Sequence, residues 1–275
     1  MEKSLIEVYK REFSSRMNEP NWAVHKTTPG HEHELIHCPI PFVGKYYHQE
    51  KTRILLYASA ENLSDYCGKR QTYLDCDDYA VNRHRNSFNS SVLNPDVFFP
   101  NVHIQPINDG CLAIVALYVY LKFQSIGRVT PAEFLEKISF ANYCKYTIQP
   151  APSKPKNKDY AGNSSYLAES HVYVENDIKI LKPDYIILPK TIYWTDRDFI
   201  DCVKGDTKII PIYQINARNI NLRIKNYPRA SEQEISPEVM EWYTHLGSNG
   251  ISWRTKENFL SVFSYLDDVM QNQMR

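Results

Sequence analysis

Arg53-Ile-Leu-Leu-Tyr-Ala58 is a short apolar run that follows a segment, residues 18–51, rich in Pro, His and Gly. The run shows no alternation of polar and apolar residues, so both faces of the segment are expected to be buried. Strands of this kind lie inside parallel sheets, which helices cover on both faces. Residues 53–58 are therefore predicted to form a central strand of a parallel sheet.

Three later segments have the same character, and helical segments stand between them. Further strands are predicted at Ile138–Tyr143, Tyr185–Leu188 and Lys208–Tyr213. Pro211 in the last of them indicates either a sheet edge or a strand end. Helices are predicted at Cys111–Gln124, Pro131–Lys137, Ser165–Ile180 and Asp196–Val203. Strands that alternate with helices are typical of a parallel sheet between two helical layers. We therefore predict an α/β fold, a three-layer α/β/α sandwich around a central, mainly parallel four-stranded sheet.

The length of 275 residues fits one large α/β domain. This domain is expected to span residues 1–275. Residues 1–40 are predicted to form an N-terminal helix, Ser4–Met17, and an irregular extension. Residues 230–275 are predicted to add C-terminal helices at Ser236–Trp242 and Lys256–Met270.

The charge of the chain is balanced. Lys and Arg number 32, and Asp and Glu also number 32, so the formal net charge is zero. A zero balance provides no global field that would attract nucleic acid. Any contact with nucleic acid is therefore expected to depend on local basic patches.

The six cysteines are scattered, and none stands in a C-x-x-C pair. This spacing argues against a zinc ribbon and a four-cysteine iron–sulfur cluster. The charged start of the chain is unlike a signal peptide, and reduced thiols are typical of the cytoplasm. The longest apolar run, residues 111–121, is too short to cross a bilayer. We expect a cytoplasmic protein without membrane contact, and with no metal or other cofactor.

Three common motifs are absent from the sequence. It contains no G-x-x-x-x-G-K-[ST] phosphate loop, no G-x-G-x-x-G fingerprint and no G-x-S-x-G elbow. With 9 glycines, the chain also lacks the usual nucleotide cradle. These absences argue against three function classes: NTPases, Rossmann dehydrogenases and ordinary α/β-hydrolases.

Candidate functional residues follow the predicted strands, because ligands of parallel sheets bind beyond the carboxyl ends of the strands. The first strand is followed by Ser59-Ala-Glu-Asn-Leu-Ser-Asp-Tyr66, which contains Glu61, Asn62 and Asp65. A carboxylate or amide at this place can position or deprotonate a water molecule. The alternative is that these side chains cap the next helix.

Asn142 stands at the end of the second predicted strand, and Lys145 follows it. A planar amide offers one donor and one acceptor, which together match the edge of a base. The alternative is a loop Asn that bonds its own backbone. Lys145 begins a Lys-rich loop, which is either a local phosphate contact or a solvated loop.

The segment after the fourth predicted strand is basic. Two apolar residues, Leu222 and Ile224, are expected to be exposed there, and the basic residues around them are Arg218, Arg223, Lys225 and Arg229. Basic residues around an apolar wedge suit a loop that enters a duplex. The alternative is an amphipathic connection whose apolar residues lie in the core.

A histidine cluster forms a separate candidate. His31, His33 and His37 stand close together, with Cys38 beside them. Imidazole is a common metal ligand, so a metal-dependent enzyme is one alternative. The spacing is not the H-E-x-x-H of metalloproteases, and the preceding Pro29-Gly30 favours a loop.

Several short motifs over residues 41–225 resemble the uracil-DNA glycosylase superfamily, whose members have a three-layer α/β/α fold with a four-stranded parallel sheet. The motifs are Pro41-Phe-Val-Gly44 with the first strand, Phe140-Ala-Asn-Tyr143, Leu181-Lys-Pro-Asp-Tyr-Ile-Ile-Leu188 and Ile212-Tyr-Gln-Ile-Asn216. The sequence departs from the family pattern at two places. The glycines after the first strand are missing, and Gln214 stands where the family has a His.

The resemblance implies an enzyme that hydrolyses the N-glycosidic bond of a uracil-like or modified base in nucleic acid, with DNA favoured over RNA. It implies that Asn142 reads the base edge and that Tyr66 stacks on the base. Gln214 and Asn216 would donate hydrogen bonds to the departing base.

The resemblance also implies a water-positioning residue after the first strand, but it leaves open whether this is Glu61, Asn62 or Asp65. Because the family His is missing, electrostatic help to the departing base would be weaker. The alternative function is therefore a catalytically silent module of the same fold that binds nucleic acid or a nucleotide.

Overall fold

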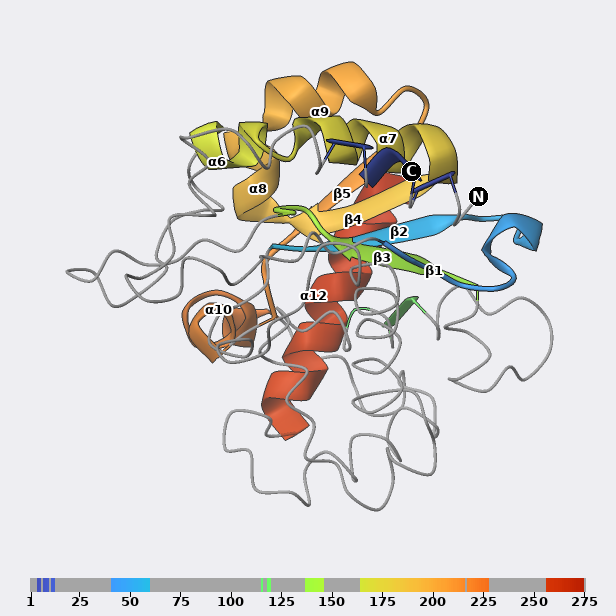
Figure 1. The fold of residues 1–275 in the computed structure, drawn as a ribbon. Coiled ribbons are helices and arrows are strands. Elements are labelled where there is room, and N and C mark those ends of the chain that lie inside the picture. The colour runs from blue at the N-terminus through green and yellow to red at the C-terminus, as the bar shows by residue number, and fades with distance from the viewer. Residues whose placement is uncertain are drawn as a thin grey trace, which may run out of the picture. The chain divides into compact units, whose positions relative to one another are not determined.

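The structure is a computed structural model. It describes residues 4–5, 7–9, 11–12, 41–59, 115, 118–119, 137–145, 164–215, 217–227 and 256–274. Figure 1 shows the helices and strands of this part of the chain. In chain order they are β1 (Phe42–Val43), η1 (Tyr47–Gln49), β2 (Ile54–Ala58), β3 (Ser139–Asn142), α6 (Ser164–Ala168), α7 (His171–Leu181), β4 (Tyr185–Pro189), α8 (Lys190–Thr195), α9 (Arg197–Val203), β5 (Lys208–Ile212), α10 (Ala217–Leu222), η6 (Ile224–Asn226) and α12 (Lys256–Met274).

The sheet has the strand order β1-β3-β2-β4-β5. Strand β2 pairs in parallel with β3 on one side and with β4 on the other. The two-residue β1 pairs antiparallel with β3 at one edge. The α/β class and the central, mainly parallel sheet are thus confirmed, and the four predicted strands correspond to β2, β3, β4 and β5. Strand β1 was not predicted, because two residues are too few to show a period.

Both faces of the central strands are covered. Every residue of β2 and of β3 is buried. Successive side chains of a strand point to opposite faces, so an unbroken buried run requires cover on each face. This burial agrees with the expectation drawn from the continuous apolar run at residues 53–58. Pro211 lies in β5, which is an edge strand, as predicted.

Helices α7, α8 and α9 cover one face of the sheet (Figure 1). Leu55 and Tyr57 of β2 point to this face, since residues two apart in a strand share a face. They belong to one apolar core, which also contains Tyr173, Val174, Ile178 and Leu181 of α7, Ile186 and Leu188 of β4, Ile192 of α8 and Ile200 of α9. Helix α7 ends where Lys182 takes a left-handed conformation, φ 48°, before Pro183.

The helix predicted at Ser165–Ile180 is divided in two. Helix α6 ends at Ala168, and α7 begins at His171. The hydroxyl of Ser170, between them, accepts a hydrogen bond from the backbone N–H of Lys145 at 2.9 Å. Sequence periodicity cannot show this long-range contact, which explains why one helix was predicted. Helix α8 was not predicted either, whereas α9 matches the segment Asp196–Val203.

The terminal predictions are tested in part. Described residues between Ser4 and Glu12 are helical, as predicted for Ser4–Met17. The predicted helix Lys256–Met270 is confirmed and continues to Met274 as α12. The predicted helices Pro131–Lys137 and Ser236–Trp242 lie essentially outside the described residues.

The chain divides into two compact units, residues 1–85 with 137–209 and residues 86–136 with 210–275. The single domain therefore stays a prediction. Within the second unit, α12 packs on η6. The hydroxyl of Tyr265 on α12 accepts a hydrogen bond from the backbone N–H of Tyr213 at 2.6 Å. Among the described helices, none is long and apolar enough to cross a membrane.

Candidate functional site

The site of interest in the first unit lies at the carboxyl ends of β2, β3 and β4. Strand β2 comes first in this set, then the chain adds β3 on one side and β4 on the other. In open parallel sheets, such a change of direction opens a crevice at the carboxyl ends, where ligands bind. Ala58 and Asn142 are partners in the register of β2 and β3, so both strands end side by side at this edge.

Asn142 lies at this edge with a nearly buried side chain, 5% exposed. Within the described part of the chain, its side-chain amide makes no hydrogen bond. The alternative in which Asn142 bonds its own backbone therefore does not describe this structure. Buried amides normally have partners, because a polar group that lacks one is costly to bury. The amide of Asn142 is therefore available to pair with a ligand at the carboxyl edge of the sheet.

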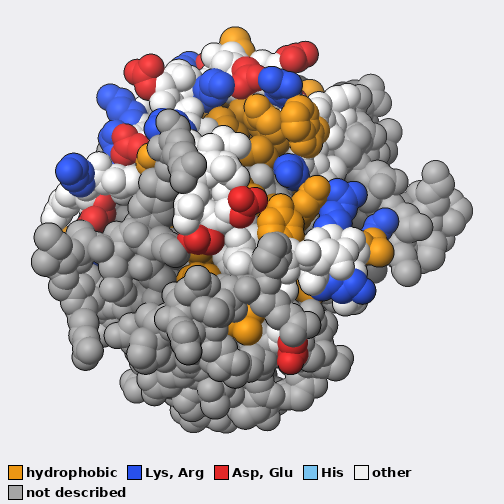
Figure 2. All heavy atoms as spheres, turned by 180° about the vertical axis from the view of Figure 1, so that it is seen from behind, with side chains coloured by type: hydrophobic (Ala, Val, Ile, Leu, Met, Phe, Trp, Pro, Cys, Tyr) orange, Lys and Arg blue, Asp and Glu red, His pale blue; other side chains and the backbone are white. Residues whose placement is uncertain are grey.

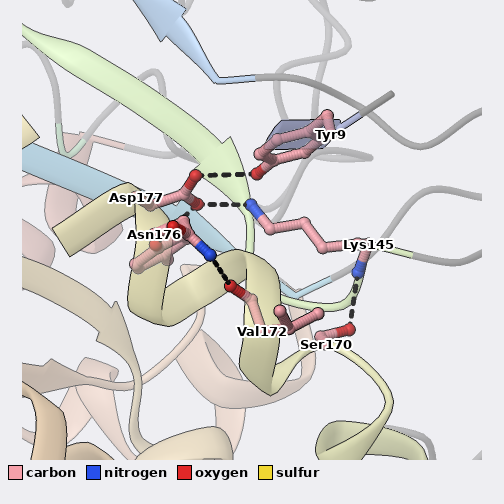
Figure 3. A network of polar contacts seen from close by, with 7 residues as sticks. Tyr9, Lys145, Ser170, Val172, Asn176 and Asp177 are labelled. Carbon is pink, nitrogen blue, oxygen red and sulfur yellow. Dashed lines mark hydrogen bonds and ion pairs between the residues drawn. The ribbon is translucent and has the colours of Figure 1, made fainter. Parts of the chain in front are cut away.

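Lys145 lies three residues further on, in a closed ionic network (Figure 3). Its Nζ is 2.7 Å from Oδ2 of Asp177 on α7, and both side chains are 0% exposed. Tyr57 donates a hydrogen bond to Oδ2 of Asp177 at 2.9 Å, and Tyr9 donates to Oδ1 at 2.7 Å. The Lys145 ammonium also lies over the rings of Tyr9 and Tyr57, 5.4 and 5.2 Å from their centroids.

The role predicted for Lys145 is corrected by this network. A phosphate group cannot reach an ammonium that is fully buried and ion-paired, so Lys145 is not a nucleic-acid contact in this structure. Burial raises the pKa of Asp177, while Lys145 and the two tyrosine hydroxyls lower it. Burial raises the pKa of Tyr57 far above its ordinary value, and the charge of Asp177 adds to the effect. Tyr57 therefore stays protonated and acts as a donor.

A second cluster at the same edge is mostly buried, with one partly exposed side chain, that of His171. His171 is the first residue of α7, and Asp196 lies between α8 and α9. Nε2 of His171 is 2.9 Å from Oδ1 and 2.8 Å from Oδ2 of Asp196. Tyr143, which follows β3, donates a hydrogen bond to Oδ2 of Asp196 at 2.7 Å. The imidazole is stacked on the ring of Phe199, with centroids 3.6 Å apart and an interplanar angle of 1°.

The side chains of this cluster differ in their exposure to solvent, and the imidazole is more exposed than the carboxylate. The side chain of His171 is 30% exposed and that of Asp196 is 7% exposed. Burial raises the pKa of Tyr143, and the negative charge of Asp196 raises it further, so the phenol stays a donor. Burial also raises the pKa of Cys144 to about 12, so its thiol is not a nucleophile at neutral pH.

Neither His171 nor Asp196 was predicted from the sequence as a site residue. His171 fell inside a single predicted helix, and Asp196 was predicted only as the start of the next one. The two residues are 25 positions apart in the chain, and at this separation no motif spacing is visible. A usable signal was present, because residues at the starts of helices after parallel strands also lie at the carboxyl edge.

Among the described residues, the second unit contains four of the predicted site residues. Leu222 at the end of α10 is 63% exposed, and Arg218 and Arg223 beside it are exposed as well. The guanidinium of Arg223 lies over the ring of Tyr213, 4.7 Å from its centroid. Figure 2 shows hydrophobic side chains at the surface with Lys and Arg side chains beside them. Gln214 is half-buried, and its backbone oxygen accepts a hydrogen bond from Asn219 at 2.9 Å.

The remaining predicted residues lie outside the described residues. They are Glu61, Asn62, Asp65, Tyr66 and Asn216, together with His31, His33 and His37 of the alternative metal site. In the part of the chain that the structure does describe, no group of His, Cys, Asp and Glu side chains could hold a metal ion.

The chain was compared with known protein families, curated proteins and solved structures. No protein-family model, no curated protein and no solved structure matches the chain.

Proposed function

We propose that this protein recognises a uracil-like or modified base in DNA and hydrolyses its N-glycosidic bond, as members of the uracil-DNA glycosylase superfamily do. The observation that supports this most directly is the side chain of Asn142. It lies nearly buried at the carboxyl edge of the sheet, and within the described residues its amide makes no hydrogen bond.

The chemistry of the amide fits a base edge. An Asn side chain presents a carbonyl acceptor and an NH₂ donor in one plane. A uracil-like ring presents the complementary pair, a carbonyl oxygen next to a ring N–H. Enzymes that act on a base extrude the nucleotide into a pocket, where hydrogen bonds to the base edge identify it. An amide held by a central strand gives a rigid reference for this recognition.

The surface of α10 supports a nucleic-acid partner. Leu222 is exposed between two arginines, Arg218 and Arg223. Apolar side chains of this kind enter a base stack, and neighbouring cations contact the phosphates. Because the formal net charge of the chain is zero, a local basic segment is needed for such binding.

The proposal is tested with labelled single- and double-stranded oligonucleotides that contain uracil, hypoxanthine, xanthine or 5-hydroxymethyluracil. Alkali cleaves the abasic product, so strand breaks report base removal. We expect the wild-type protein to release one of these bases. Asn142→Leu should reduce the rate about 5- to 150-fold, since each good bidentate contact is worth about 1–3 kcal/mol.

The stability of the variant separates recognition from folding. Because the amide of Asn142 makes no hydrogen bond within the described residues, Asn142→Leu should unfold at a denaturant concentration no lower than wild type. The exposed Asn226→Leu is the matched control and should leave the rate unchanged. Full activity in folded Asn142→Leu would refute the proposal. Salt-sensitive binding without base release would instead establish the silent binding module.

A further inference from the structure

The imidazole of His171 is fixed in place but leaves one nitrogen unused. Nε2 is held by both oxygens of Asp196, and Phe199 fixes the plane of the ring. Among the described residues, Nδ1 of His171 has no hydrogen-bond partner. The side chain of His171 is 30% exposed. A partly exposed ring that an acidic partner orients through one nitrogen has the arrangement of a catalytic histidine.

The neighbours of His171 favour a base. Asp196 accepts from Nε2–H, which fixes the tautomer in which Nδ1 is the lone-pair nitrogen. The same carboxylate stabilises the imidazolium that forms when Nδ1 takes a proton. Tyr143 donates to Asp196 and keeps this carboxylate in position. The other candidates nearby are unsuitable, because Cys144 holds its proton and Lys145 is buried.

Two charged residues near this pair in the chain have other ionic partners. Glu175, one turn along α7, binds Lys179 at 2.6 Å. Arg197, the residue after Asp196, binds Asp201 at 3.3 Å. Asp196 is therefore the ionic partner of His171 among the described residues.

The pair of His171 and Asp196 and the amide of Asn142 are both linked to the end of β3. Asn142 and Tyr143 are consecutive residues at the end of β3, so the amide and the phenol leave this strand end on opposite sides. The amide of Asn142 and the cluster of Tyr143, Asp196 and His171 thus both belong to the carboxyl edge of the sheet, the edge at which ligands of parallel sheets bind. The base and the sugar are adjoining parts of one nucleotide, so recognition of the base and attack at the sugar call for groups at the same edge.

We infer that His171 is the general base of the N-glycosidic hydrolysis, an inference that rests on the proposed function. Nδ1 accepts a proton from water, and the water oxygen forms the new bond to the anomeric carbon of the sugar. The bond between that carbon and the base nitrogen breaks, and its electron pair leaves with the base. The base anion then takes a proton from solvent, and His171 returns its proton to solvent.

The test compares single-turnover base release by the full chain with binding to an uncleavable strand. The uncleavable strand contains pseudouridine, whose base is joined to the sugar through carbon. His171→Gln should slow base release about 100- to 10,000-fold, the range of general acid–base catalysis, and leave binding within about twofold. His48→Gln, at an exposed histidine of η1, is the matched control and should match wild type.

Two further readouts separate a proton-transfer role from a merely structural one. Added imidazole should restore part of the rate of His171→Ala, because the small base can enter the space left by the side chain. The acidic limb of the pH–rate profile of wild type should be missing in His171→Gln, since no imidazole remains to be deprotonated.

The outcomes are distinct. If wild type releases the base and His171→Gln does so within about twofold of it, the inference is wrong while the proposed function holds. Loss of rate in His171→Gln without rescue of His171→Ala, and with an unchanged acidic limb, would also overturn the inference. If wild type releases no base from any strand, the proposed function fails and the inference fails with it.

Discussion

Two carboxylates near the end of β3 have similar partners but different access to water. Asp177 accepts from Tyr9, Tyr57 and Lys145, and its side chain is 0% exposed. Asp196 accepts from Tyr143 and His171, and the imidazole is 30% exposed. Each network joins a carboxylate, at least one tyrosine hydroxyl and a basic nitrogen group. The closed network can serve only the fold, because no ligand reaches it, whereas the open network has a nitrogen available for chemistry.

The largest expected effect tests whether the Asp177 network is closed. Lys145→Met removes the counter-ion and leaves a buried carboxylate with two phenols. Breaking a buried ion pair from one side typically costs about 3–5 kcal/mol, so the free energy of unfolding should fall by about this amount. Urea unfolding followed by circular dichroism measures the change.

The double variant Lys145→Met/Asp177→Leu is the control for this prediction. Replacing both partners with apolar side chains removes the uncompensated charge, so stability should return at least in part. If Lys145→Met alone unfolds at the wild-type urea concentration, Asp177 is not confined to a dry network. The contrast between the two carboxylates would then be lost.

A pair of tyrosine substitutions sharpens the contrast. Tyr57→Phe and Tyr143→Phe each delete one hydroxyl that donates to a carboxylate. Hydrogen bonds to charged groups are worth about 1.5–3 kcal/mol, and Tyr57→Phe should cost an amount in this range because its site is fully buried. Tyr143→Phe should cost less, because Asp196 is 7% exposed and Asp177 is 0% exposed, so water can replace the lost donor more readily at Asp196. Thermal or urea unfolding of both variants gives the comparison, and equal losses would contradict it.

Tyr143→Phe should also affect catalysis. If Tyr143 positions Asp196, its loss should slow base release more than that of Tyr57→Phe, even though it disturbs the fold less. We therefore expect Tyr57→Phe to lose more stability and Tyr143→Phe to lose more activity. This result would indicate that the Asp177 network is structural and the Asp196 network is functional.

The fold was predictable to a large extent because local patterns determine it. The continuous apolar runs at residues 53–58 and 185–188 indicated buried parallel strands, and the structure has β2 and β4 there. The division of the helix at Ser170 was not predictable, because it depends on a hydrogen bond from Lys145.

The candidate site was predictable only where a residue directly follows a strand. Asn142 was identified by this rule, since the end of an apolar run is visible in sequence. The same rule suggested a phosphate contact for Lys145, and it failed because Asp177, 32 residues later, binds the ammonium. His171 and Asp196 were missed for the same reason, as their pairing exists only after α7 and α8 have packed on the sheet.

A third carboxylate extends the comparison toward full exposure and gives the smallest expected effect. Asp184, just before β4, is 39% exposed and binds Arg53, just before β2. The backbone N–H of Arg53 donates to Oδ2 of Asp184 at 2.7 Å, and the guanidinium donates to both carboxylate oxygens at 3.3 Å. Partial burial raises the pKa of Asp184, but the hydrogen bonds and the charge of Arg53 outweigh it, so the net pKa is lowered.

A carboxyl group whose pKa is lowered by folding stabilises the folded state at any pH above its unfolded pKa. This contribution is lost as the pH falls through the lowered pKa of the folded state. Wild type should therefore be slightly more stable than Asp184→Asn at pH 7, and the difference should shrink between pH 4 and pH 2. Because water screens this exposed pair, the difference should be well below that of Lys145→Met. Urea midpoints across this pH range measure it, with Asp198→Asn as the control for loss of one exposed carboxylate. A difference that stays constant down to pH 2 would show that Asp184 acts through its shape alone and not through its charge.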